Sequence, residues 1–452
     1  MTRTARTSAT AAALVGAAAL LGGEPCGAVV VLRRSRAGAE LEDYSFERFV
    51  RDFGRDYAPS SQEFTRRAAV FEASLAQVRA VNARNAKEGR PWTAGVHPFM
   101  DWTAEERRAL NGYKPAGGRG RRSALRGAVS LLHSGARAFV RGMANATWGW
   151  ESFSTEALNT DEGGTPAGSG PAIRNQGNCG SCWAISAVEA VEAQLIRSGA
   201  GRARVAAQAL VDCVPNPQHC GGSGGCEGAT GELAYAFMRD YGIPLESEMP
   251  YHARTEQCAQ APLSGPWRAA SSRVRVDGWT ALPSNKAEPL MQALTQAGPV
   301  VVAVDGNNWF NYDSGVFDDC DKDAILGHAV LAKGYGKDGG NKYWLIQNSW
   351  GADWGEQGHI RLLRHDDEDS WCGTDNKPKE GVGCDGGPPE ITVCGTCGIL
   401  YDPIFPTGVR IEGAEAGAPA EAAQAAHASL VSQESFVDGE DALLDSMRAA
   451  LQ

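Results

Sequence analysis

The feature that most constrains this chain is the stretch 175–189, in which a turn of small residues ends in a cysteine and leads into a predicted helix. Ala184, Ala187 and Val188 recur at three- and four-residue steps, which is typical of the buried side of a helix. Cys182 therefore begins this helix. Unpaired main-chain N–H groups and the positive end of the helix dipole favour an anion there, so the thiol loses its proton more readily. The stretch predicts a nucleophilic thiolate, which can cleave a peptide bond through a covalent intermediate.

Length, charge and cysteine content narrow the class of protein. The chain has 452 residues, of which 43% are hydrophobic, and this is enough for a large core with accessory segments. The formal net charge of −11, without a basic stripe interleaved with aromatic residues, argues against a nucleic-acid partner. Twelve cysteines, most of them after residue 178, favour an oxidising compartment, because cytosolic proteins rarely carry so many.

The N-terminus has the layout of a secretory signal peptide, predicted over residues 1–28. Basic residues precede an apolar, alanine-rich run at 11–21, and small residues follow it. The alternative is a membrane anchor that extends to Leu32. Glu24 and Pro25 interrupt that run, however, and leave it short of the about 20 apolar residues that a span needs.

Two further segments have the composition of accessory regions. Residues 113–156 include a glycine- and arginine-rich run and predict a linker with processing sites, in which Asn145 begins a glycosylation sequon. Residues 411–452 are rich in alanine and acidic residues and predict a removable tail, because little of this segment could be buried.

A histidine and an asparagine lie at the ends of predicted strands in the second half of the chain. Of eight histidines, only His328 lies at the start of a predicted apolar strand, in the stretch 326–330. Asn348 lies at the end of the next apolar strand, in the stretch 343–351. A cysteine nucleophile needs a general base and a group that orients this base, so both residues are candidates for those roles.

Together these stretches resemble the active-site motifs of papain-like cysteine proteases, in the same order along the chain. Gln176 lies six residues before Cys182, as in that family, and the segments 208–213 and 225–228 are also similar to family segments. The resemblance covers about residues 44–112 and 171–406.

The resemblance implies a role for each active-site residue. Cys182 would attack the scissile carbonyl as a thiolate paired with a His328 imidazolium. Asn348 would accept a hydrogen bond from the His328 ring, and Trp350 would shield that bond from water. Gln176 would donate its side-chain amide to the oxyanion, beside the main-chain N–H of Cys182.

The same resemblance implies a set of substrate-binding residues: Gly228, Ala229, Ala303, Trp350 and Asp402. Ala229 stands where the family has a second glycine that pairs with the substrate backbone. Asp402 would form the floor of the pocket for the second substrate residue, where an acidic side chain can meet an arginine. The alternative is that Pro403 shifts the loop and Asp402 points to solvent.

Residues 41–112 resemble the inhibitory pro-domain of cathepsin L-like zymogens. The matches to the interrupted helix signature of these propeptides are Glu63, Arg67, Phe71, Val78 and Asn82, with Ser74 and Val78 in place of the usual Asn and Ile. Gly95, Phe99 and Asp101 keep the spacing of the family's Gly-x-Asn-x-Phe-x-Asp strand, in which His97 replaces the Asn. The alternative is a free-standing helical domain.

The peptidase domain is expected over residues 157–410, as an α+β, papain-like fold of two halves. The first half is helical, and the second is β-barrel-like, with the active-site cleft between them. Apolar, β-branched runs at 299–304, 329–333 and 342–347 predict strands, and glycines punctuate the residues between them.

The family resemblance also implies three disulfides, Cys179–Cys226, Cys213–Cys258 and Cys320–Cys397. Four cysteines, Cys220, Cys372, Cys384 and Cys394, then have three alternative pairings, and Cys26 lies in the signal. A disulfide-closed insertion is favoured over a structural zinc site made by Cys372, Cys384, Cys394 and Cys397. A redox motif at 179–182 is disfavoured, because turn formers rather than a strand precede it.

The sequence therefore predicts a cysteine endopeptidase that is made as a zymogen and enters the secretory pathway, ending outside the cell or in a lysosome or vacuole. Its expected partners are polypeptide substrates and its own propeptide as an intramolecular inhibitor. A monomer without metal, organic cofactor, nucleic acid or stable membrane span is expected. The alternative is a catalytically inactive papain-like binding protein.

Overall fold

The computed structural model describes residues 41–112, 170–258 and 273–413. The expected signal peptide (1–28), the linker (113–156) with its sequon, and all but the first residues of the tail (411–452) lie outside these described residues. We call 41–112 the pro-segment, 170–258 the helical half and 273–413 the sheet half. Within these three ranges, no helix combines the length and the apolar character that crossing a membrane requires.

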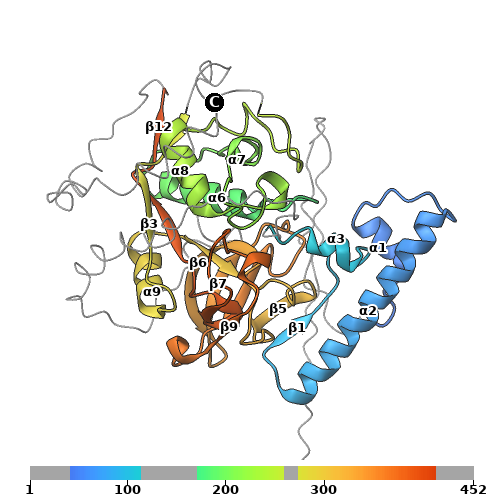
Figure 1. Ribbon diagram of the computed structural model, residues 1–452. Coiled ribbons are helices and arrows are strands. Elements are labelled where there is room, and N and C mark those ends of the chain that lie inside the picture. Colours follow the sequence, from blue (N-terminus) through green and yellow to red (C-terminus); the bar gives the residue numbers. More distant parts are fainter. Residues whose placement is uncertain (1–40, 113–169, 259–272, 414–452) are drawn as a thin grey trace, which may run out of the picture. The chain divides into compact units, whose positions relative to one another are not determined.

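The pro-segment is built on one long helix, α2 (Gln62–Glu88), drawn in blue in Figure 1. It begins where the Ser61 side chain accepts a hydrogen bond from the Phe64 N–H, and it ends at Gly89, whose φ of 68° suits a residue without a Cβ. The buried side of α2 contains Phe71, Ser74, Leu75, Val78 and Asn85. The shorter elements are α1 (Phe46–Asp52), β1 (Trp92–Ala94) and α3 (Ala104–Arg108).

The family's strand motif over residues 95–101 does not form a strand in this structure. β1 ends at Ala94, and the chain then turns, with the Met100 N–H donating to the His97 carbonyl and the Trp102 N–H to the Phe99 carbonyl. These local hydrogen bonds replace strand pairing. β1 itself pairs with β5 (Tyr312–Phe317) in antiparallel fashion, so the pro-segment adds a strand to the sheet half (Figure 1).

The helical half contains three α-helices between residues 170 and 258: α6 (Cys182–Arg197), α7 (Ala207–Cys213) and α8 (Gly231–Tyr241), with a short 3-10 turn, η2 (Gly225–Glu227). Of the 16 residues of α6, 13 are buried. A helix that is buried all round must be surrounded by other elements. α6 contacts α7, α8 and strand β6, and this packing fixes the position of its first residue.

The sheet half contains a mixed sheet of eight strands in the order β1-β5-β8-β7-β6-β4-β11-β3. Only the pair β5–β8 is parallel among these neighbours. The remaining bounds are β3 (Gly278–Ala281), β4 (Val300–Val304), β6 (His328–Asp338), β7 (Asn341–Gln347), β8 (His359–Leu363) and β11 (Ile404–Thr407). Strands β4, β6 and β7 lie where the β-branched, apolar runs predict them.

Smaller elements surround this sheet. Helix α9 (Ala287–Gln296) packs on β4 and β6. Two short two-stranded sheets pair β9 (Cys372–Asp375) with β10 (Ile391–Cys394), and β2 (Arg273–Arg275) with β12 (Arg410–Glu412). Three 3-10 turns complete the described chain: η4 (Glu368–Ser370), η5 (Pro378–Glu380) and η6 (Thr396–Gly398).

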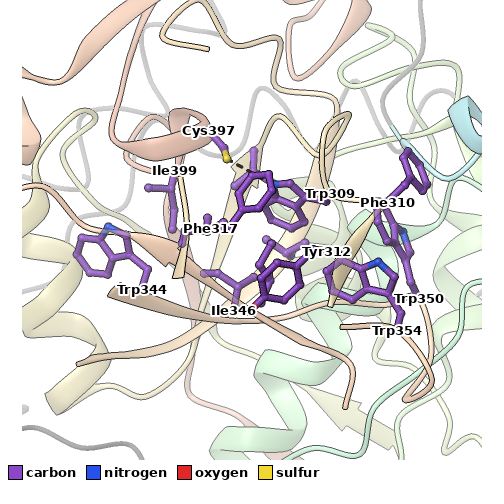
Figure 2. Close-up of a cluster of buried hydrophobic side chains, with 14 of the residues drawn as sticks. Trp309, Phe310, Tyr312, Phe317, Trp344, Ile346, Trp350, Trp354, Cys397 and Ile399 are labelled. Carbon is purple, nitrogen blue, oxygen red and sulfur yellow. Dashed lines mark hydrogen bonds between the residues drawn. The ribbon is translucent and has the colours of Figure 1, made fainter. Parts of the chain in front are cut away.

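Large aromatic side chains fill the core of the sheet half (Figure 2). The ring of Phe310 stacks on that of Trp350 with centroids 4.6 Å apart, and Trp354 meets Trp350 edge-on at 5.0 Å. Such pairs are worth about 0.5–1.5 kcal/mol beyond the area they bury. This packed core therefore restrains the loop after β7, and that loop carries Asn348.

Candidate active site

Cys182 is the first residue of α6, as the sequence predicts, and its side chain is fully buried. It is the one cysteine of the described residues that is not in a disulfide. The main-chain N–H of Ala329, the residue after His328, donates to the Cys182 sulfur at 3.4 Å. The start of the buried helix and the start of β6 therefore meet at the thiol.

His328 and Asn348 meet because β6 and β7 are antiparallel neighbours. The His328 Nε2 lies 2.8 Å from the Asn348 Oδ1, so Nε2 carries the proton and donates it to the amide oxygen. The other ring nitrogen, Nδ1, is buried and has no hydrogen-bond partner within the described residues. The ring of Trp350 stacks on the imidazole, with ring centroids 5.1 Å apart.

The electrostatics of this buried site differ from the expected thiolate–imidazolium pair. Burial raises the pKa of the Cys182 thiol to about 11, although hydrogen bonds from main-chain N–H groups, including that of Ala329, act in the opposite direction. Burial also lowers the pKa of His328 to about 4, against the hydrogen bond to Asn348. Both shifts favour the neutral thiol and the neutral imidazole. The helix N-terminus alone predicts a thiolate, but the cost of removing the charge from water outweighs it here.

Gln176 is held by the loop that carries Asn348. The Gln176 N–H donates to the Ser349 carbonyl at 2.8 Å, and the Gln176 Oε1 accepts from the Ser349 hydroxyl at 2.6 Å. The Gln176 Nε2 donates to two carbonyls, those of Cys179 and Leu110, each at 2.8 Å. The amide expected to bind an oxyanion therefore binds a main-chain carbonyl of the pro-segment. Ser349, which orients this amide, was not among the residues predicted from the sequence.

The end of the pro-segment lies directly on the thiol. A Cβ placed on Gly112 would lie 2.3 Å from the Cys182 sulfur, so no residue with a side chain fits there without displacement. A Cβ on Gly228 would lie 1.6 Å from the Gly112 carbonyl oxygen, and the Gly228 φ of 98° also favours glycine. We call the main chain of residues 110–112, between Gln176 and Gly228, the peptide path.

The other expected substrate-binding residues differ in their surroundings. Ala229 and Ala303 are buried. Trp350 meets Phe99 of the pro-segment edge-on, with ring centroids 5.8 Å apart. Asp402 is half-buried, and its carboxyl group hydrogen-bonds to that of Glu232 on α8. Burial and the Glu232 carboxyl raise the pKa of Asp402 well above its usual range.

Charged side chains hold the pro-segment against the sheet half. Arg84 and Arg90 pair with Asp319, at 2.5 and 3.0 Å, in the loop after β5. The Trp92 indole N–H donates to Asp318 at 3.0 Å. No local pattern predicts these contacts, because each charged partner alone looks like an ordinary surface residue.

A further contact uses the histidine that replaces the family asparagine. The His97 ring lies 3.2 Å from the Asn311 amide oxygen of the sheet half, and burial lowers its pKa well below the usual range. In the sequence alone, His97 is only a departure from the family pattern. In the structure it bridges the pro-segment and the sheet half.

The described residues form five disulfides: Cys179–Cys226, Cys213–Cys258, Cys220–Cys384, Cys320–Cys397 and Cys372–Cys394. The pairings Cys220–Cys384 and Cys372–Cys394 resolve the alternatives that the sequence left open. All four cysteines of the zinc hypothesis are thus in disulfides, which contradicts it. Cys179 bonds to Cys226, so it does not form a redox pair with Cys182.

Comparisons with known proteins identify families that match most of the described chain. The family described as "Papain family cysteine protease" matches residues 165–382, and that described as "Cathepsin propeptide inhibitor domain (I29)" matches residues 46–106. The rice (Oryza sativa subsp. japonica) "Cysteine endopeptidase RepA" is 33% identical over 312 residues, 67% of this chain and 74% of that protein. "Senescence-specific cysteine protease SAG39" of the same subspecies is 30% identical over 362 residues, 78% of this chain and 94% of that protein.

A solved structure is similar over both the pro-segment and the two halves. Digestive procathepsin L 3 from the Tenebrio molitor larval midgut has a TM-score of 0.55 and 26% sequence identity, and the match covers 80% of this chain and 97% of that chain. The expected α+β fold, with a helical pro-domain before a helical half and a sheet half, is confirmed.

Proposed function

Because the chain belongs to the papain family of cysteine proteases, we propose that Cys182, His328 and Asn348 are the catalytic residues of an endopeptidase made as a zymogen. The observation that carries the proposal is the hydrogen bond from the Gln176 amide to the Leu110 carbonyl, next to Cys182. A peptide main chain already lies against the nucleophile and against the donor that the reaction needs. The pro-segment therefore inhibits by occupying the place of the substrate.

The proposed reaction uses the two ring nitrogens of His328 differently. Nε2–H donates to Asn348, which fixes the tautomer and leaves the Nδ1 lone pair free to take the thiol proton. The Cys182 sulfur attacks the substrate carbonyl carbon, and the oxyanion accepts from the Gln176 amide. His328 then returns the proton to the leaving amine, and water hydrolyses the thioester that remains.

Removal of the pro-segment has to precede this reaction. The same burial that raises the pKa of Cys182 and lowers that of His328 keeps both groups neutral, so release of residues 110–112 favours the ion pair by returning water to the site. We propose residues 41–112 as the inhibitory pro-domain and 157–410 as the peptidase domain. The substrates are polypeptides, cleaved by a monomer in the secretory pathway, outside the cell or in an acidic vacuole or lysosome.

The proposed substrate-binding residues are Gly228, Ala229, Ala303, Trp350 and Asp402. Gly228 supports the assignment most directly, because it already packs against the Gly112 carbonyl. In this arrangement the Gly228 end of the peptide path holds the residues on the N-terminal side of the scissile bond. Ala229 and Asp402 distinguish this chain from the usual family pattern.

The test is to acidify the purified full-length protein, sequence the N-terminus of the product and follow hydrolysis of a peptide substrate. Cys182→Ala and His328→Ala are each expected to lower the rate by roughly 10⁴-fold or more and to leave the protein folded. His252→Ala, an exposed histidine, is the matched control and is expected to keep full activity. Unchanged hydrolysis by Cys182→Ala would show that another group is the nucleophile.

A further inference from the structure

One disulfide connects the two halves of the described peptidase. Cys220 lies in the loop after α7, and Cys384 lies between β9 and β10. The other four described disulfides each stay within one half. The match to the papain family ends at residue 382, inside the segment that carries Cys384. We call residues 378–385 the strap.

On the helical side, the strap is attached to the loop that contacts Gly228. The Gly221 N–H donates to the Gly383 carbonyl at 3.1 Å, and the Asp385 side chain lies 2.8 Å from the His219 ring. Gly221 in turn packs on Gly228, where an added Cβ would lie 2.2 Å from the Gly221 carbonyl oxygen. Gly228 therefore lies between Gly221, to which the strap is attached, and Gly112 of the peptide path.

On the sheet side, the strap is attached just before His328. A Cβ on Gly381 would lie 2.5 Å from the Leu326 carbonyl oxygen, and the Leu326 N–H donates to Asp375 at 3.2 Å. The next residue, Gly327, faces Asn111 of the peptide path, since an added Cβ would lie 3.7 Å from the Asn111 Cβ.

The link between these two attachment points is short. Gly381 and Gly383 are separated by one residue, so their Cα atoms are at most about 7 Å apart. The residue between them, Val382, is buried in the same hydrophobic cluster as Leu326, Ala303 and Ala229. The main-chain contacts thus run from Gly228 through the strap to Leu326 and Gly327, and they join the two sides of the peptide path.

We propose that the strap closes the Gly228 end of the peptide path and makes the enzyme selective for peptides with few residues on the N-terminal side of the scissile bond. The inference rests on the proposed function, because it assigns the Gly228 end to the N-terminal side of the substrate. A longer N-terminal extension would have to displace Val382 or break the Gly221–Gly383 contact. The substrate class is therefore short oligopeptides and chains cleaved close to their N-terminus.

The experiment uses the full-length protein after acid maturation and a series of peptides identical around the cleaved bond. The peptides carry two to eight residues before that bond, and kcat/KM is measured by chromatography of the products. For the parent, kcat/KM is expected to fall by at least tenfold between the shortest and the longest peptide. The double variant Cys220→Ser/Cys384→Ser is expected to flatten this dependence. Alkylation and mass measurement verify that the parent's strap disulfide stays closed during the assay.

The double variant Cys372→Ser/Cys394→Ser is the matched control, because it removes a disulfide next to the strap that does not join the two halves. It is expected to keep the parent's length dependence. If the Cys220→Ser/Cys384→Ser protein fails to fold, the dependence of kcat/KM on peptide length in the parent tests the proposal by itself. A flat profile in the parent, or a length dependence that the folded double variant retains, overturns the role of the strap. Absence of hydrolysis of every peptide would instead overturn the proposed function.

Discussion

The guanidinium group of Arg67 binds both carboxylate oxygens of Glu106, with nitrogen–oxygen distances of 2.7 Å on each side. Arg67 lies on α2, and Glu106 lies on α3, four residues before Leu110. The same carboxylate accepts from the Thr103 N–H at 2.7 Å and so caps α3. One acidic side chain therefore joins the long helix of the pro-segment to the residues that cover the thiol.

We predict that Glu106→Gln makes the precursor mature at a higher pH. The hydrogen bond from Arg67 lowers the pKa of Glu106 from 4.5 to about 2. A carboxyl group with a depressed pKa stabilises the folded state above its unfolded pKa and loses that contribution as the pH falls through the folded value. The contribution is thus full above about pH 4.5 and disappears towards pH 2. The Glu106→Gln variant lacks this stabilising contribution at every pH.

Charged hydrogen bonds contribute about 1.5–3 kcal/mol, and partial exposure of this pair reduces that to about 1 kcal/mol. The variant should therefore be processed roughly five times faster than the parent at pH 5–6, as followed by gel electrophoresis. Glu105→Gln, an exposed neighbour on α3, is the control and should behave like the parent. Identical processing of Glu106→Gln and the parent across the pH series would contradict a role of this pair in maturation.

We also predict that the acidic loop after β5 restrains release of the pro-segment. Asp318→Asn/Asp319→Asn removes the charges that Arg84, Arg90 and Trp92 contact. Partly exposed pairs of this kind are worth about 0.5–1 kcal/mol each and are screened by salt. The double variant should mature several times faster at low ionic strength, and the difference should shrink in 1 M salt. Asp321→Asn, exposed nearby, is the control, and an equal effect there would point to net charge alone.

Several parts of the fold and the site could be predicted from the sequence because their signals are local. The strands β4 and β6 follow from apolar runs, which are β-branched in β4, and the start of α6 follows from a turn next to an apolar helix. His328 lies at the start of β6 and Asn348 just after the end of β7. Because these neighbouring strands are antiparallel, both residues lie at the same end of the strand pair. These features depend on spacing within one stretch of chain.

The relationships that could not be predicted join residues far apart in the sequence. Nothing near Asp402 indicates Glu232, and nothing near Cys220 selects Cys384 from the other cysteines. The neutral state of Cys182 in the precursor depends on a distant contact for the same reason. The helix terminus is a local signal that favours the thiolate, whereas the burial that opposes it depends on Gly112, 70 residues earlier in the chain.

The burial of Cys182 predicts slow alkylation of the precursor. With a pKa of about 11, about a thousandth of the thiol is ionised at pH 8, and only the thiolate reacts with iodoacetamide. The rate should rise about tenfold for each pH unit up to pH 10. After maturation the rate should be high and nearly independent of pH from 6 to 8. Labelling is measured by peptide mass spectrometry, with denatured precursor as the control. Fast, pH-independent labelling of intact precursor would contradict the neutral thiol.

The last prediction concerns the choice between phenylalanine and arginine next to the cleaved residue. Because burial and Glu232 raise the pKa of Asp402, the carboxyl pair keeps a proton in acid and becomes charged enough to bind arginine only as the pH rises. Two fluorogenic dipeptides that differ only in Phe or Arg should therefore show an Arg/Phe ratio of kcat/KM that increases from pH 4.5 to 7. Asp402→Asn should lower Arg cleavage about 10- to 100-fold, which corresponds to about 1.5–3 kcal/mol for a charged hydrogen bond, and should spare Phe cleavage. Glu232→Gln removes the repulsion and should move the rise in the ratio to lower pH, while Glu390→Gln, an exposed acid, should leave it in place. Equal losses on both substrates, or no Arg cleavage by the parent at any pH, would show that Asp402 does not line the pocket.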